Sequence, residues 1–203
     1  MVLKIFDKGL QTKQIQHIIS CIRNGGIIIY PTDTIYGIGT GLSNIKSLDR
    51  IAQLKSKRKE DLNYTLLCHN LSQLSNFSNP ISNSLFRFMK AHTPGPYTFI
   101  LEANNEVPRL FQSKKKQIGI RVPAHPMLRQ IIEALGEPLL NTSIDSEDDN
   151  SPEYITDPEY IHDKFGKKVD LVIDGGIGMI QYSTILDCTQ EEIQIIRQGI
   201  GIL

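Results

Sequence analysis

Hydroxyl groups follow an apolar segment near the start of this sequence, and they could bind a small ligand. Thr32, Thr34 and Tyr36 come directly after the β-branched run that stops at Tyr30-Pro31. Ligands of α/β proteins tend to bind beyond the carboxyl ends of strands. We therefore expect these hydroxyls to face a small polar ligand, although turn formation explains the same residue types.

A run of basic residues is the second candidate for chemistry. Lys55, Lys57 and Arg58 lie just past a helical pattern. Several cations so close together can neutralise a triphosphate, and arginine adds bidentate geometry. The alternative is a set of exposed cations that complement the negative end of a helix dipole.

Single polar residues inside other apolar segments extend the pattern. Arg121 lies in the segment GIRVP, where an unpaired charge is costly, so it meets either an anion in a cavity or an internal ion pair. Ser143, Ser183 and Arg197 also lie at the ends of apolar segments. Together these residues predict one shared cavity that binds anions.

The sequence lacks the common patterns of covalent or metal-assisted catalysis. Its glycines form no GxxxxGK[ST] phosphate loop, and Gly37-Ile38-Gly39 lacks the third glycine of a dinucleotide fingerprint. No GxSxG elbow is present, and the five histidines do not have the spacing of metal ligands. We therefore expect no metal site, and no catalytic residue can be named with certainty.

Apolar periodicity predicts the elements that would position these side chains. Helices are expected over 12–23, 44–54, 81–91, 127–135 and 157–165, and strands over 27–30, 64–68, 97–101, 118–122, 169–173, 183–186 and 193–197, with a short strand near 139–140. The polar, acidic segment from Thr142 to about Thr156 is expected to form a mobile surface loop. The order of elements predicts an α/β fold with a mixed, twisted sheet, in a single domain over 1–203.

Composition restricts the class of protein. No apolar run approaches the roughly 20 residues needed to cross a bilayer. Cys21, Cys68 and Cys188 are far apart and form no CxxC pair, which predicts three small buried side chains in a reducing cytoplasm. The net charge is zero, but basic residues gather at 46–59 and 109–121 and acidic ones at 145–159. Such segregation suits phosphates or nucleic acid, unless the runs are ordinary solvated surface.

Read in order, seven stretches resemble the YrdC/Sua5/YciO family from about residue 13 onward: YPTDTIYGIG, LKSKRK, HTPGPYTFIL, IGIRVPAHP, LLNTS, STILD and IIRQG. The resemblance implies an open α/β fold whose twisted mixed sheet surrounds a basic concave cavity. The catalytic branch, threonylcarbamoyl-AMP synthase, joins L-threonine, bicarbonate and ATP into threonylcarbamoyl-adenylate and releases pyrophosphate, for the t6A modification of tRNA. The resemblance implies ATP with Mg²⁺ as the substrate complex. It also implies no permanent cofactor and no membrane partner.

The same resemblance implies roles for the residues singled out above. Thr32, Thr34 and Tyr36 would border the threonine and carbamate. Arg121 and Ser183 would hold the amino-acid carboxylate, and Lys55 with Lys57 or Arg58 would bind the ATP phosphates. Ser143 corresponds to the serine of the family's Ser-x-Asn motif, and Arg197 would lie on the nucleotide side. Adenylate formation mainly requires that anions be held together, which fixed cations and hydroxyls can do without a covalent nucleophile.

Two departures from the synthase pattern leave alternatives open. Asp145 stands where the synthases have asparagine, and a carboxylate repels a triphosphate unless a cation intervenes. The stretches LNYTLLCHNLSQLSNFS and FMKAHTPGPYTFIL look more like the YciO branch, and no C-terminal Sua5 domain is expected after Gly199-Ile200-Gly201. The first hypothesis is a synthase-like nucleotidyltransferase. The alternatives are a non-catalytic protein that binds double-stranded RNA or tRNA, and a ligand-binding module that has lost the nucleotide.

Overall fold

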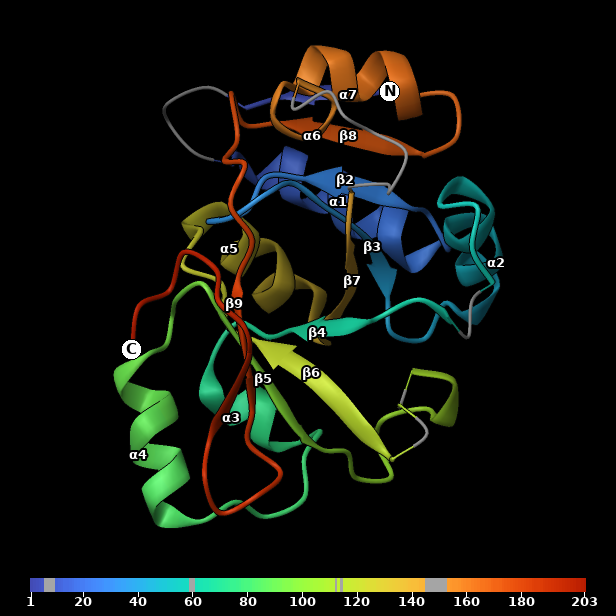
Figure 1. Ribbon diagram of the computed structural model, residues 1–203. Coiled ribbons are helices and arrows are strands. Elements are labelled where there is room, and N and C mark those ends of the chain that lie inside the picture. The colour runs from blue at the N-terminus through green and yellow to red at the C-terminus, as the bar shows by residue number, and fades with distance from the viewer. Residues whose placement is uncertain (6–9, 59–60, 112, 114, 145–152) are drawn as a thin grey trace.

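One mixed β-sheet is the frame of the molecule (Figure 1). The computed structural model describes residues 1–5, 10–58, 61–111, 113, 115–144 and 153–203. Across the sheet the strand order is β1-β8-β2-β3-β7-β4-β6-β5-β9-β10. The strands are β1 (Val2–Lys4), β2 (Ile28–Tyr30), β3 (Gly37–Gly41), β4 (Thr65–Leu67), β5 (Tyr97–Glu102), β6 (Gln117–Arg121), β7 (Leu139–Ser143), β8 (Leu171–Asp174), β9 (Thr184–Asp187) and β10 (Gln194–Arg197). The mixed α/β fold expected from the sequence is confirmed.

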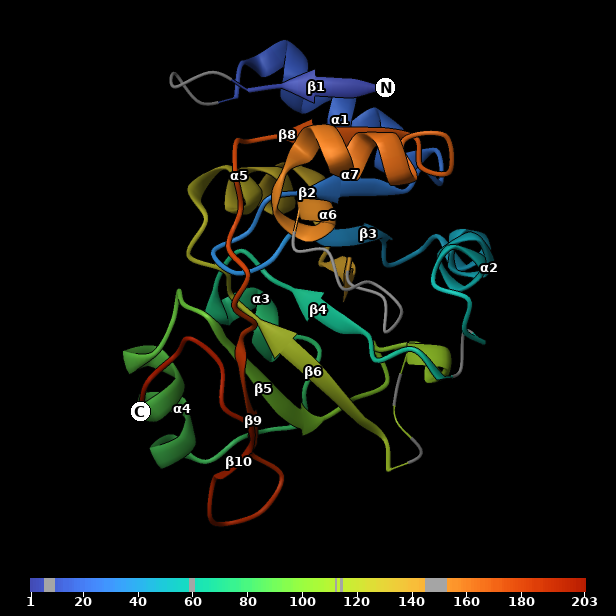
Figure 2. The ribbon, with the colours of Figure 1, turned by 45° about the horizontal axis from the view of Figure 1, so that its top comes forward.

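Helices cover both faces of this sheet (Figures 1 and 2). They are α1 (Thr12–Arg23), α2 (Ile45–Leu54), α3 (Leu71–Ser75), α4 (Asn83–Ala91), α5 (Pro126–Leu135), α6 (Glu153–Thr156) and α7 (Pro158–Phe165), with a short 3-10 helix at Arg109–Phe111. Helices α1 and α5 pack on one face, and α2, α3, α4 and α7 contribute buried side chains to the core on the other. None of the helices in the described residues is long and apolar enough to cross a membrane.

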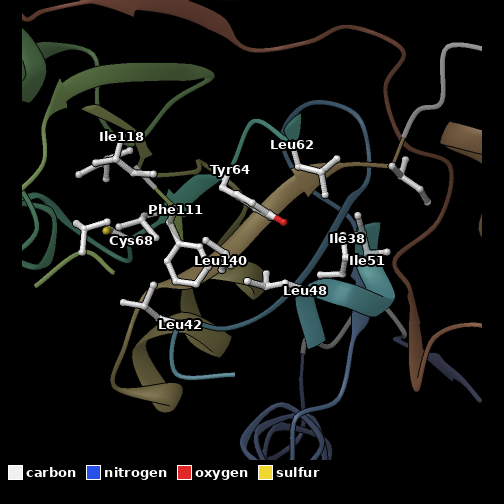
Figure 3. Packing of buried hydrophobic residues seen from close by; sticks show 14 of the residues in the cluster. Ile38, Leu42, Leu48, Ile51, Leu62, Tyr64, Cys68, Phe111, Ile118 and Leu140 are labelled. Carbon is white, nitrogen blue, oxygen red and sulfur yellow. The ribbon is translucent and has the colours of Figure 1, made fainter. Parts of the chain in front are cut away.

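The larger core lies on the face covered by α2, α3, α4 and α7 (Figure 3). Leu48 and Ile51 of α2 pack there against Ile38 of β3 and Leu140 of β7, and all four are at most 1% exposed. These strand residues alternate with side chains that point to the other face, as the twofold period of a strand requires. The sheet therefore has one heavily packed face and one face on which small residues can leave a hollow.

Local sequence signals explain where the helices end. Helix α5 begins at Pro126, whose missing N–H costs nothing in the first turn of a helix. It ends at Gly136, which adopts the left-handed conformation (φ 82°) that favours glycine. Asn70 and Ser82 cap α3 and α4 by accepting hydrogen bonds from backbone N–H groups. The helices expected at 12–23, 44–54, 81–91, 127–135 and 157–165 are confirmed to within two residues at each end.

Two expectations about the chain beside the site are wrong. The strands expected from the sequence do not include Gly37–Gly41, but this segment forms β3, a buried strand that pairs with β2 and β7. Thr142 and Ser143 were expected in a mobile loop, but they end β7 because they pair with Ile38 and Gly37. Of the remaining loop, residues 145–152, with Asp145 and most of the acidic cluster, lie outside the described residues, and α6 follows them.

The cysteines are only partly as expected. Cys68 and Cys188 are buried, and burial raises the pKa of the Cys188 thiol to about 12. Cys21 is half-buried on α1. All three are free thiols.

Removing a core side chain from α5 is expected to lower stability strongly. Leu128 is fully buried between α5 and the sheet, so Leu128→Ala should cost about 2–5 kcal/mol of unfolding free energy through lost burial and a residual cavity. Urea denaturation followed by circular dichroism measures the change. Ile180→Ala is the control, because Ile180 is 61% exposed and its truncation should change stability by about 0.5 kcal/mol or less. Equal effects of the two variants would contradict this packing.

Candidate functional site

Small residues form a row across the middle of the sheet. Directly paired residues point to the same face. The pairings place Gly39 of β3 beside Asn141 of β7, then Thr65 of β4, Gly119 of β6 and Ile100 of β5. The first four are two glycines and two short polar residues, and beside Asn141, Thr65 and Gly119 this face is hollow, opposite the larger core.

A cavity of about 550 Å³ opens over this hollow. Drug-sized ligands typically occupy pockets of roughly 300–1,000 Å³, so the volume suits a small molecule rather than an ion alone. Its wall includes hydroxyl, amide and cationic side chains and one carboxylate from separate parts of the chain: Thr32, Thr34, Lys55, Lys57, Asp61, Asn63, Tyr64, Thr65, Thr98, Ser113, Gln117, Arg121, Asn141, Thr142, Ser143, Tyr182, Ser183 and Arg197. Apolar side chains such as Leu62, Phe111 and Ile196 complete it.

The PTDT segment is held in place by a buried ion pair. Arg121 donates from Nη2 to Asp33 Oδ1 at 2.6 Å and from Nη1 to the Thr34 hydroxyl at 2.9 Å. The Arg121 and Asp33 side chains are only 7% and 15% exposed. The Thr32 hydroxyl donates to the Ile35 carbonyl and accepts from the Thr34 N–H. Thr32 and Thr34 thus both form the turn and line the cavity.

Three buried polar atoms beside this pair have no hydrogen-bond partner among the described residues. They are Asp33 Oδ2, Arg121 Nε and His125 Nδ1. Burial lowers the pKa of the Arg121 guanidinium, and the Asp33 charge opposes that shift. Burial likewise lowers the pKa of His125, again opposed by Asp33. Arg121 already donates to two protein groups, the Asp33 carboxylate and the Thr34 hydroxyl. Its expected role in binding a ligand carboxylate therefore stays a prediction.

Tyr36 lies in the cavity wall, but its hydroxyl holds the backbone of a neighbouring loop. It donates to the Gly176 carbonyl at 2.7 Å and accepts from the Gly175 N–H at 3.3 Å. Burial raises the pKa of this phenol to about 12. The loop after β8 is thereby fixed across the end of the PTDT segment.

The raised pKa of Tyr36 predicts a stability change in alkaline solution. The unfolded chain loses this phenolic proton near pH 10, whereas the folded protein keeps it until about pH 12. The stability that it contributes is therefore fully present below pH 10 and lost as the pH rises to 12. We expect Tyr36→Phe to flatten the fall in unfolding free energy over that window, measured by urea denaturation at several pH values. Tyr160→Phe, at a half-exposed phenol, should leave the slope unchanged.

Basic side chains reach the cavity from two sides. Lys55, just after α2, donates from Nζ to the Ser143 carbonyl at 2.6 Å, and Lys57 also lines the wall. On the other side, the Arg197 guanidinium donates to the Ser183 carbonyl at 3.0 and 3.2 Å and lies over the Tyr182 ring at 4.8 Å. Lys55 and Arg197 are thus held by protein acceptors before any ligand binds.

The structure brings most of the predicted site residues to one cavity. Its wall contains Thr32, Thr34, Tyr36, Lys55, Lys57, Arg121, Ser143, Ser183 and Arg197. Arg58 lies outside that wall: its side chain is 78% exposed and makes two hydrogen bonds to Asp61. Of the two alternatives beside Lys55, the geometry therefore favours Lys57. Asp145 lies outside the described residues.

Several residues in or beside the wall were not predicted. Asp33, which lies outside the wall and binds Arg121, was not singled out, because its partner is far away in the sequence. Thr98 lies inside the PGPYT stretch, and its hydroxyl is 3.0 Å from that of Ser183. Asn141 lies inside LLNTS, two residues before Ser143, and this spacing on one strand could have indicated that both share a face.

The site contains no protein-built metal centre in the described part of the chain. No group of three or more His, Cys, Asp or Glu side chains there could hold a metal ion. What the arrangement can do is hold anions, through fixed cations and hydroxyl donors in a partly enclosed space.

The fold and cavity define an α/β protein whose mixed sheet carries a cavity with hydroxyl and cationic side chains in its wall. A family model for Sua5, YciO and YrdC proteins, described as telomere recombination, matches residues 20–199. The chain therefore belongs to the Sua5/YciO/YrdC family. The resemblance noted in the sequence is confirmed.

Individual relatives fall into two groups. YciO of Escherichia coli (strain K12), whose function is uncharacterized, is 41% identical over 192 residues, covering 94% of this chain and 91% of that protein. Its crystal structure has a TM-score of 0.90 to this chain. Threonylcarbamoyl-AMP synthase of Coxiella burnetii (strain RSA 493 / Nine Mile phase I) is 29% identical, covering 82% of this chain and 88% of that protein. The family thus contains such synthases as well as YciO proteins.

A further structural relative shares the fold. P. abyssi Sua5, solved in complex with L-threonine, has a TM-score of 0.88 at 24% identity. The likeness covers 98% of this chain and 57% of that one.

Proposed function

We propose that this protein is a nucleotidyltransferase of the threonylcarbamoyl-AMP synthase type, acting on L-threonine, bicarbonate and ATP. The observation that carries the proposal is the convergence of Lys55, Lys57 and Arg197 on one cavity with a wall rich in hydroxyls. The likeness to the C. burnetii synthase supports it. The L-threonine in P. abyssi Sua5 is a fact about that protein, to which this chain is similar in fold.

The reaction needs anions to be held together more than it needs a nucleophile from the protein. The threonine amine attacks the carbon of bicarbonate, and loss of water leaves a carbamate. A carbamate oxygen then attacks the α-phosphorus of ATP, the bond from that phosphorus to the bridging oxygen breaks, and pyrophosphate leaves. Both steps bring negative charges together, so fixed cations lower the electrostatic cost. ATP would enter as its magnesium complex, since Mg²⁺ commonly binds through phosphates and water.

The two sides of the cavity suit different parts of this reaction. Lys55 and Lys57 form a cationic side for the triphosphate, and Ser143 adjoins them through its carbonyl. Ser183 offers a hydroxyl for the amino-acid carboxylate. Arg197, expected from the resemblance on the nucleotide side, donates from Nη2 to that hydroxyl at 3.3 Å and would add its positive charge there. The PTDT segment, held by Arg121, would border the carbamate between them.

The RNA-binding alternative has weaker support. It requires the basic cluster at 46–59 to face phosphates, yet Arg50 pairs with Asp170 at 2.9 Å and Arg58 with Asp61 at 2.7 Å. No observation favours it over binding of a small anion. If it were correct, affinity for duplex RNA would fall steeply with salt, because bound counterions are released.

A pyrophosphate-release assay tests the proposed function. The protein is incubated with ATP, Mg²⁺ and bicarbonate, with and without L-threonine. We expect release that requires threonine. Release at the same rate without threonine, or with L-valine in its place, would contradict the proposal. Duplex RNA titrated at several salt concentrations in parallel would detect the alternative.

A further inference from the structure

Tyr30 and Asn141 lie on strands that are not neighbours, yet their side chains are hydrogen-bonded. The Tyr30 hydroxyl donates to Asn141 Oδ1 at 2.7 Å. Strand β3 separates β2, which carries Tyr30, from β7, which carries Asn141. The phenol therefore reaches across β3, on the face of the sheet that bears the cavity.

Two glycines of β3 leave the room that this contact needs. A Cβ at Gly37 would lie 2.4 Å from Asn141 Oδ1 and 2.9 Å from Tyr30 Cε2. A Cβ at Gly39 would lie 2.8 Å from the Tyr30 hydroxyl and 2.3 Å from the Leu140 carbonyl. Glycine weakens a central strand, and close approach of another group is a common reason for it. A side chain at either position would thus collide with the Tyr30–Asn141 pair, and at Gly39 with the Leu140 carbonyl as well.

The direction of the hydrogen bond fixes the amide of Asn141. Tyr30 is fully buried, which raises the pKa of its phenol and keeps it a neutral O–H donor. The nearby positive charge of Arg121 opposes that shift. The same charge favours a phenol oxygen turned toward the guanidinium and a hydrogen turned toward Asn141. With Oδ1 thus occupied, the Asn141 amide presents its NH₂ group elsewhere.

The cavity is where that NH₂ group can find an acceptor. Asn141 is part of the wall, and no described residue accepts a hydrogen bond from its Nδ2. Ser143 lies on the same face two residues along β7, and Lys55 contacts the Ser143 carbonyl. A donor beside this cationic side suits an oxygen of a phosphate or carboxylate.

We propose that Asn141 binds an oxygen of the anionic ligand through its amide NH₂ group, and that Tyr30 is the positioning residue that orients this amide. The inference rests on the proposed function only in taking the cavity as the ligand site. It assigns to Gly37 and Gly39 the role of leaving room for this orientation.

Side-chain amide NMR with inorganic pyrophosphate as the probe tests the inference. The Asn141 NH₂ signals of the ¹⁵N-labelled protein are identified by their loss in Asn141→Ala. They should shift as pyrophosphate binds. We expect Asn141→Ala to weaken binding about 10-fold, as for loss of a hydrogen bond to a charged group. Tyr30→Phe, which keeps the ring, should weaken binding several-fold. The double variant should match Asn141→Ala alone, because Tyr30 acts only through Asn141.

The matched control is Tyr97→Phe, which removes another tyrosine hydroxyl, bonded to the Ile202 carbonyl at 2.6 Å outside the cavity wall. It should leave pyrophosphate binding unchanged.

Binding that leaves the Asn141 signals in place, or additive losses in the double variant, would overturn the inference while the proposed function stands. If Tyr30→Phe fails to fold, the wild-type shifts and Asn141→Ala still decide. Absence of any anion binding would overturn both, and Asn141 shifts without threonine-dependent release would overturn the proposed function alone.

Discussion

Lys57→Met is expected to reduce threonine-dependent pyrophosphate release by about 10²–10³-fold, the usual effect of removing one fixed group that stabilises developing charge. Lys57 lines the cavity on the side assigned to the triphosphate. Methionine keeps much of the length of the side chain and removes only the charge, so packing should change little. Initial rates at saturating ATP measure the effect.

Two other basic residues make this prediction specific. Lys46→Met removes an exposed charge of α2 outside the wall and should leave the rate unchanged. Arg58→Met separates the two alternatives that the sequence left open beside Lys55, and we expect a much smaller loss than from Lys57→Met. Equal losses in the Lys57 and Arg58 variants would mean that the charge of the whole run matters, rather than its position in the cavity.

Asp33→Asn is expected to lower the free energy of unfolding by about 3–5 kcal/mol, because it leaves the buried Arg121 charge uncompensated. The folded protein keeps only about 5–15 kcal/mol in total, so this is a severe loss. Urea denaturation at neutral pH measures it. Joining Arg121→Met to Asp33→Asn removes the stranded charge and should recover a large part of the loss.

An exposed ion pair provides the control for that experiment. Lys4 and Glu159 approach to 3.9 Å, with side chains 60% and 81% exposed. Glu159→Gln should therefore cost about 1 kcal/mol or less. If Asp33→Asn were as mild as Glu159→Gln, the buried pair would not be what holds the PTDT segment.

Local patterns allowed much of this fold to be predicted from the sequence. The helix over Thr12–Arg23 follows from its apolar spacing, and the left-handed Gly136 marks the end of α5. Strand β3 escaped prediction because its sequence, GIGTG, lacks bulky side chains. Gly37 and Gly39 are explained by Tyr30, Asn141 and the Leu140 carbonyl, which lie closer than 3.0 Å to where a Cβ would be. Such a reason depends on tertiary packing, which local propensity does not contain.

The candidate site was predicted in its residue types but not in its contacts. Hydroxyls and cations at the ends of apolar segments indicated an anion site, and the register of the sheet brings them together. Arg121 was expected to meet either an anion or an internal carboxylate. That its partner is Asp33 depends on how β6 and the segment after β2 meet in space. Contacts between residues so distant in sequence leave no local pattern.

The most direct test of the account follows the carbon of bicarbonate. The protein is incubated with L-threonine, Mg·ATP and ¹³C-bicarbonate, and the nucleotides are analysed by mass spectrometry. The account predicts an AMP adduct that contains threonine and one labelled carbon, formed together with pyrophosphate and lost in Lys57→Met. Recovery of AMP or ADP alone, with no label joined to threonine, would contradict the proposal that this cavity makes threonylcarbamoyl-adenylate.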